Sequence, residues 1–108
     1  MEEFRLEMFI VLMLLEKNDN FRNSYSLTRV LHWQFGMLSD IEIRKRMVED
    51  GLITRDHGNE KYMWKITFEG RKYLAKYFEK GRTIVFHSFP EKKEFLDVLF
   101  NGFVCPQT

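Results

Sequence analysis

The sequence predicts a mainly α-helical fold with one small β-hairpin, and three observations support this. Residues 3–17 form a long apolar stretch without Gly or Pro, as expected for a helix. Residues 39–51 begin with a capping-box pattern and end in glycine, which are common limits of a helix. Around His57-Gly58-Asn59 the apolar pattern changes to period two, as in strands that flank a turn. The expected order is three helices, a hairpin, a fourth helix and a C-terminal helix.

Size and composition limit the class of protein. A chain of 108 residues has the length of one domain, and 44% hydrophobic residues supply its core. The formal net charge of +1 does not by itself indicate a nucleic-acid partner. A single cysteine, Cys105, excludes an internal disulfide and fits a reducing compartment, so we expect a cytoplasmic protein. The apolar run Met8–Leu15 is too short to span a bilayer, and no membrane partner is expected.

The first two predicted helices differ in their apolar patterns. Residues 3–17 are apolar around most of the helix, so this helix must be covered on more than one side. The second helix begins near Ser24 or Ser26, and either residue can serve as its N-cap. Leucines one turn apart predict its buried stripe, and Gly36 is placed to end it.

The third helix is predicted from its two ends and its apolar spacing. Ser39 and Glu42 form a capping box at its start. Ile43 and Met47 are four residues apart and are expected to face inward. Gly51 occupies the position that usually follows a helix C-terminus.

Two short strand candidates, LITRD and KYMWKI, surround the turn-forming residues HGNE. Trp64 and Ile66 alternate with their neighbours as in a strand with one buried face. Thr67 is expected to cap a fourth helix, and Gly70 in its first turn marks close approach to another backbone. Gly81 is expected to end that helix.

The C-terminal segment begins with TIVFH, which fits either a strand or a continuation of the fourth helix. Ser88-Phe-Pro-Glu then forms a second capping box and predicts a helix from about Phe89 to Asn101. We therefore divide the chain into a domain at residues 1–80 and a C-terminal extension at residues 81–108. The apolar side of the last helix would hold Phe95, Leu96, Leu99 and Phe103.

Three segments follow one another in an informative order: RMVEDGLI (Arg46–Ile53), the hairpin through Asn59, and ITFEGRKYL (Ile66–Leu74). This order resembles the winged helix-turn-helix superfamily, in particular small regulators of the MarR and PadR kind. The resemblance covers about residues 5–80. It implies the winged helix fold of a DNA-binding protein and a role in transcription regulation.

The resemblance also implies how the parts would be used. A recognition helix at about residues 39–50 would enter a DNA major groove, and a wing at about residues 54–62 would touch the backbone or minor groove. Homodimers would form through the terminal helices. Family recognition helices usually begin with small polar residues, whereas this helix begins with Asp40, Ile41 and Glu42.

The third helix supplies the first candidate DNA contacts. With Ile43 and Met47 inward, Ile41 and Lys45 point outward and Arg44 lies on the flank. Arg44 and Lys45 can reach phosphates, arginine can also read guanine, and Ile41 can pack on a thymine methyl. The alternative is that these cations form a solvated helix face near the C-terminal half of the helix, where cations are favoured.

The wing and the second helix supply the remaining candidates. Wing cations could approach a phosphate backbone, although an ordinary polar hairpin has the same pattern. The N-terminal turn of the second helix could meet a phosphate, although its polar residues also suffice for capping alone. The candidates are Arg55, His57 and Lys61 on the wing and Ser26, Thr28 and Arg29 on the second helix.

Charge is unevenly distributed along the chain. Residues 44–82 hold eleven basic and six acidic residues, a net charge of +5. Residues 1–43 have a net charge of −3 and the rest of the chain −1. Phosphate neutralisation supplies most non-specific DNA affinity, so this segment favours double-stranded DNA as the partner.

The expected function follows from these patterns. We find no phosphate-binding loop, nucleophile elbow or cluster of metal ligands, so we expect no enzyme activity, cofactor or metal. The favoured hypothesis is a winged-helix transcription regulator, homodimeric through helix one and the C-terminal helix. In one alternative, the C-terminal extension covers helix one within a single chain. Others are a winged-helix protein-interaction module and an accessory factor of replication or mobile elements.

Overall fold

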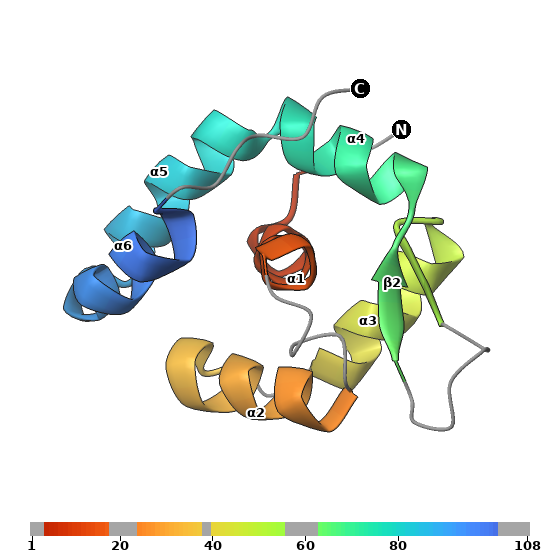
Figure 1. Ribbon diagram of the computed structural model, residues 1–108, viewed down its shortest axis with the longest axis horizontal. Coiled ribbons are helices and arrows are strands. Elements are labelled where there is room, and N and C mark those ends of the chain that lie inside the picture. Colours follow the sequence, from red (N-terminus) through yellow and green to blue (C-terminus); the bar gives the residue numbers. More distant parts are fainter. Residues whose placement is uncertain (1–3, 18–23, 38–39, 56–62, 102–108) are drawn as a thin grey trace.

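The computed structural model describes residues 4–17, 24–37, 40–55 and 63–101. They form a mainly helical fold with one two-stranded antiparallel hairpin, as the sequence predicts, in an order compatible with a winged helix (Figure 1). The elements are α1 (Leu6–Lys17), α2 (Ser24–Phe35), α3 (Asp40–Glu49), β1 (Ile53–Arg55), β2 (Trp64–Ile66), α4 (Phe68–Lys76), α5 (Phe78–Ser88), the 3-10 helix η2 (Pro90–Lys92) and α6 (Lys93–Phe100).

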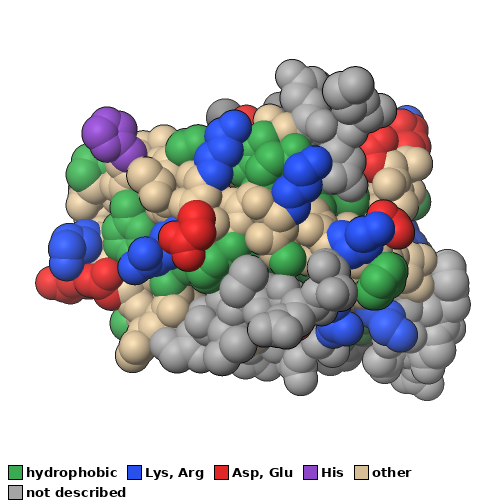
Figure 2. Space-filling view, turned by 90° about the horizontal axis from the view of Figure 1, so that it is seen from above, with side chains coloured by type: hydrophobic (Ala, Val, Ile, Leu, Met, Phe, Trp, Pro, Cys, Tyr) green, Lys and Arg blue, Asp and Glu red, His purple; other side chains and the backbone are tan. Residues whose placement is uncertain are grey.

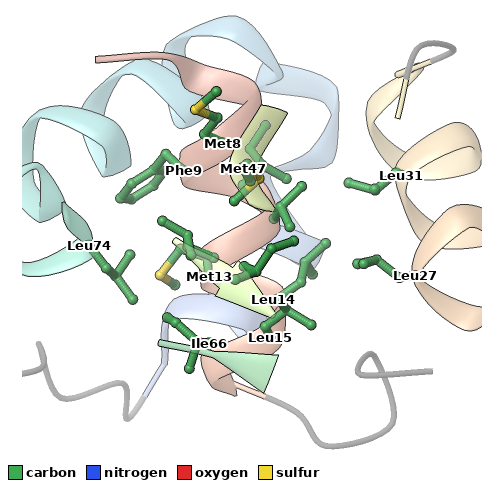
Figure 3. Packing of buried hydrophobic residues seen from close by; sticks show 14 of the residues in the cluster. Met8, Phe9, Met13, Leu14, Leu15, Leu27, Leu31, Met47, Ile66 and Leu74 are labelled. Carbon is green, nitrogen blue, oxygen red and sulfur yellow. The ribbon is translucent and has the colours of Figure 1, made fainter. Parts of the chain in front are cut away.

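Helix α1 lies at the centre of the molecule, with the other elements arranged around it (Figure 1). Every residue from Met8 to Leu15 is buried, which confirms that this helix is covered on more than one side. In Figure 3 its side chains extend toward Leu31 of α2, Met47 of α3 and Leu74 of α4. The core is therefore one cluster around α1.

Two glycines end α2 and α3 as predicted. Gly36 has φ 63° and its N–H donates to His32, while Gly51 has φ 77°. Only glycine adopts this left-handed conformation without strain, so both positions suit a helix C-terminus. After Gly51 the Leu52 N–H donates to the Met47 carbonyl and closes the last turn of α3. The predicted cap Ser39 lies outside the described residues.

The hairpin pairs Ile53 with Ile66 and Arg55 with Trp64. Trp64 and Ile66 are buried and Lys65 between them is exposed, so the period-two prediction is confirmed. Buried side chains on one face hold the hairpin against the helices, and α1 and α3 both contact it. The wing tip at residues 56–62 lies outside the described part of the chain.

The start of α4 is tied to the end of α3. The Thr67 hydroxyl accepts from the Gly70 N–H at 3.0 Å, which confirms the predicted N-cap. A Cβ at Gly70 would overlap the Leu52 carbonyl oxygen and lie 2.8 Å from Cγ1 of Ile66. The predicted close approach is thus real, and it sets the distance between α4 and the hairpin.

Two predictions at the C-terminal end are wrong. Gly81 does not end a helix: it is buried within α5, where a Cβ would meet the Phe9 ring at 2.6 Å. The helix breaks earlier, at Tyr77, and TIVFH continues α5. Ser88 is the last residue of α5 and not an N-cap, and no side chain caps η2 or α6. The expected domain boundary at residues 80 and 81 therefore falls inside α5.

The expectation that helix one forms a dimer interface is also wrong for residues 8–15, because they are buried within the single chain. The C-terminal elements complete the same core. Phe35 of α2 contacts Phe89 and Phe95 edge to face, with ring centroids 5.3 and 5.9 Å apart. Leu96 and Leu99 of α6 are buried as predicted. The apolar surface that suggested a dimer is thus largely used inside the chain.

Candidate nucleic-acid interface

Helix α3 presents three of its residues to solvent on one face. Ile41 is 70% exposed, Val48 is 43% exposed, and Lys45 lies exposed between them. The opposite side of α3 buries Met47 and half-buries Ile43, as their spacing predicts. The outward positions predicted for Ile41 and Lys45 are confirmed.

A buried polar cluster, the Asp40 cluster, joins α2 to α3; it consists of Thr28, His32, Asp40 and Arg44. Asp40 accepts from the Thr28 hydroxyl at 3.0 Å and contacts His32 Nε2 at 2.5 Å. Arg44 Nη2 lies 3.0 Å from Oδ2 of Asp40, the same oxygen that accepts from Thr28, and Arg44 Nη1 donates to the Thr28 hydroxyl at 3.1 Å. Three of these contacts join α2 to α3, and the fourth, between Asp40 and Arg44, lies within α3. Such a network holds the two helices at a fixed relative angle.

Arg44 is buried instead of lying exposed on the flank of α3, which corrects the sequence interpretation. It is only 5% exposed, and its guanidinium lies 5.7 Å from the centre of the Trp64 ring. Burial lowers the pKa of Arg44 from its usual value, Arg55 adds to this lowering, and Asp40 opposes it. An arginine with this many internal partners serves the fold, and reaching a base edge would cost it those contacts.

A groove of about 480 Å³ lies between α3 and the hairpin. Arg55 stacks over the buried Trp64 ring at 5.0 Å and forms the edge of the groove on the hairpin side. The Trp64 Nε1–H is buried without a hydrogen-bond partner among the groups described, which costs about 1–3 kcal/mol. We call the face formed by α3 and the hairpin the α3–hairpin surface. It consists of Ile41, Glu42, Lys45, Arg46, Val48, Glu49, Asp50, Arg55, Trp64 and Lys65.

The other predicted DNA contacts differ in their exposure to solvent. Thr28 is half-buried in the Asp40 cluster and so does not offer its hydroxyl to a phosphate. Ser26 is half-buried and Arg29 is exposed, with its guanidinium 5.0 Å from the Trp33 ring centre. His57 and Lys61 lie outside the described residues. Of the helix-two candidates, only Arg29 is exposed to solvent.

Trp33 of α2 is 71% exposed. Trp64 is buried on β2, as its alternation with its neighbours predicts. The two tryptophans therefore have different environments, and only Trp64 lines the groove.

The excess positive charge of residues 44–82 is divided between two faces. The α3–hairpin surface has four exposed cations and three exposed carboxylates among the described residues. A second face, the α4–α5 face, has five exposed cations and two exposed carboxylates. Figure 2 looks onto this second face and shows Lys and Arg side chains spread over it. Its cations are Arg71, Lys72, Lys76, Lys80 and Arg82.

Sequence reasoning missed His32 and the buried role of Asp40. The signal was present: Thr28 and His32 are four residues apart, as are Asp40 and Arg44. Each pair therefore lies on one face of its helix, and two such pairs can meet where the helices pack. We interpreted Asp40 only as an acidic residue at the start of a recognition helix.

Comparison of the chain with models of protein families, with curated proteins and with solved structures finds no match. Within the described ranges, no helix has the length and apolar character needed to cross a membrane. The same ranges hold no group of three or more His, Cys, Asp or Glu side chains placed to bind a metal ion.

Proposed function

We propose that the chain binds double-stranded DNA through the α3–hairpin surface, as a winged-helix regulator of transcription. The observation that supports this most directly is the exposed face of α3, which lies beside the antiparallel hairpin and is fixed to α2 by the Asp40 cluster. A helix held in this way can be presented rigidly to a major groove, which is about 12 Å wide.

Three of the four exposed cations on this surface have a role in this proposal. Lys45 lies at the centre of the exposed face of α3, and Lys65 and Arg55 are exposed on the hairpin. They would neutralise phosphates on either side of the groove that receives α3. Arg44 contacts no DNA in this scheme, because it stabilises the packing of α2 on α3.

Binding of random-sequence duplex DNA at ~50 and ~200 mM salt tests the proposal, since phosphate contacts make affinity fall steeply with salt. Replacing both Lys45 and Arg55 with Ala should weaken binding and reduce the salt slope by about two. The matched control replaces Lys76 and Lys80 of the α4–α5 face with Ala, which should leave the slope unchanged. Absence of binding at low salt, or a slope that depends only on the control pair, would contradict the proposal.

A second candidate is a winged-helix module that binds a protein. It is favoured by the groove, whose walls include Ile41 and Val48, and by Glu42 and Glu49, which lower the positive charge of α3. This candidate predicts weak or undetectable duplex binding, with no steep dependence on salt. The salt titration therefore distinguishes the two candidates in one measurement.

A further inference from the structure

We infer that Ile41 and Val48 read thymine methyl groups, so that the α3–hairpin surface prefers duplexes rich in A·T pairs. This inference rests on the proposed function and names the base chemistry that the same surface would recognise. It starts from three features of α3: an exposed apolar pair, a cation between its members, and an arginine withdrawn into the fold.

The apolar pair is unusual for its placement. Five large hydrophobic side chains are strongly exposed among the described residues, and two of them, Ile41 and Val48, lie on one face of α3. They are seven residues apart, which is two turns and about 10.5 Å along a helix. Both line the groove beside Trp64. Ile41 and Val48 lie on the helix that would face the DNA, and their two-turn spacing suits two separate apolar contacts.

The major groove offers one apolar group on base edges, the C5-methyl of thymine. Successive base pairs are about 3.4 Å apart, so a 10.5 Å spacing corresponds to about three base-pair steps. Ile41 and Val48 can therefore each meet a methyl group about three steps apart. Guanine and cytosine lack this methyl group, so aliphatic side chains placed on their edges meet mainly the polar N7, O6 and N4 groups and leave them unpaired.

The withdrawal of Arg44 supports the same preference. Bidentate contact from arginine is the commonest way to read guanine. The Arg44 guanidinium is instead held by Asp40 at 3.0 Å and Thr28 at 3.1 Å. Its neighbour Lys45 lies between the apolar side chains and can neutralise a phosphate or approach a base. The side of α3 that carries Ile41 and Val48 thus contacts bases chiefly through aliphatic groups, with Lys45 as the cation that lies between them.

The test compares two duplexes of about two helical turns, one of alternating dA and dT and one in which deoxyuridine replaces every thymine. Deoxyuridine pairs like thymine and lacks only the methyl group. Burial of a methyl is equivalent to about a fourfold change in affinity, so two contacts predict a preference for the thymine duplex on the order of 15-fold. An alternating dG–dC duplex should bind no more tightly than the deoxyuridine duplex.

Two variants test whether Ile41 and Val48 cause the preference for the thymine duplex. Ile41→Ser and Val48→Ser should each reduce the preference for thymine to about fourfold. Val98→Ser is the matched control, because Val98 is 73% exposed on α6 and lies away from the groove. Far-ultraviolet circular dichroism checks that each variant is folded, which is expected because these side chains are exposed.

Three results would overturn the inference in distinguishable ways. If the thymine and deoxyuridine duplexes bind with equal, salt-dependent affinity, contacts with the methyl groups are excluded and the proposed function is unaffected. If both serine variants keep the full preference for the thymine duplex, Ile41 and Val48 are not the residues that contact the methyl groups. Failure to bind any of the three duplexes at low salt would overturn the inference together with DNA binding itself.

Discussion

The α3–hairpin surface and the α4–α5 face differ in what their charged residues do. On the first, Arg44 and Asp40 are buried together and the exposed charges almost balance. The second has five exposed cations and two exposed carboxylates. Helix α1 lies between this second face and α2 (Figure 1). A net charge counted along residues 44–82 adds these two faces together. Net charge along the chain therefore locates a basic segment without locating the surface on which it acts.

The cations of the α4–α5 face also have a structural use. Lys80 Nζ lies 5.0 Å from the Phe4 ring centre, Lys76 Nζ lies 5.2 Å from that of Tyr77, and Arg82 lies 5.6 Å from that of Phe86. Their long side chains cover aromatic rings at the edge of the core while the charges stay in water. Positive charge on this face is thus explained by packing without any polyanion.

The largest effect is expected from Asp40→Ala, which removes the carboxylate of the buried ion pair beside the α3–hairpin surface. Removing Asp40 leaves Arg44 buried without its carboxylate, and such a loss costs about 3–5 kcal/mol of unfolding free energy. Urea denaturation measures it. Asp97→Ala is the control, because Asp97 forms an exposed pair with Lys93 and its loss should cost less than about 1 kcal/mol. Equal losses for the two variants would show that the Asp40 cluster contributes no more than a surface pair.

A smaller effect is expected from Gly70→Ala, at the junction between the two surfaces. The new methyl group would push against the Leu52 carbonyl and the Ile66 side chain, so α4 must shift away from the hairpin. Overpacking of this kind costs about 1–3 kcal/mol, although alanine favours helix by about 1 kcal/mol over glycine. Thermal denaturation should show a net loss, while Lys72→Ala on the exposed side of α4 should change stability by less than about 0.5 kcal/mol. A Gly70→Ala protein more stable than the wild type would contradict the close packing.

The smallest effect is expected from Lys80→Ala, which removes one cation–π contact on the α4–α5 face. Loss of the contact with Phe4 should lower the unfolding free energy by about 0.5–1 kcal/mol. Lys80→Met keeps most of the side-chain packing without the charge, so it separates the cation–π contribution from burial. If both variants are as stable as the wild type, the cations of this face are simply solvated.

Local signals in the sequence were sufficient for most of the fold. The apolar run in α1, the glycines that end α2 and α3, and the Thr67 cap each lie within or next to a single helix. Gly81 misled because its local pattern was overruled by a contact from far along the chain, and Ser88 misled because α5 continues through it. At Gly81 the distant contact is the ring of Phe9, which fills the space beside the glycine.

The candidate site was harder to predict for the same reason. Ile41 and Lys45 face solvent because helical periodicity alone places them there. The burial of Arg44 depends on Thr28 and Trp64, which come from two other elements. No spacing within α3 could reveal those partners. Periodicity therefore predicted which side of α3 faces out, and tertiary contact decided which of its cations is available.

The central position of α1 has a consequence for how the protein is made. At a synthesis rate of 5–20 residues per second, α1 leaves the ribosome on the order of several seconds before the chain reaches α5. During that interval the side chains from Met8 to Leu15 lack much of their eventual cover, since α4 and α5 both pack on α1. Nascent chains of this protein should therefore bind chaperones through their first helix and be released only after residues of α5 have emerged.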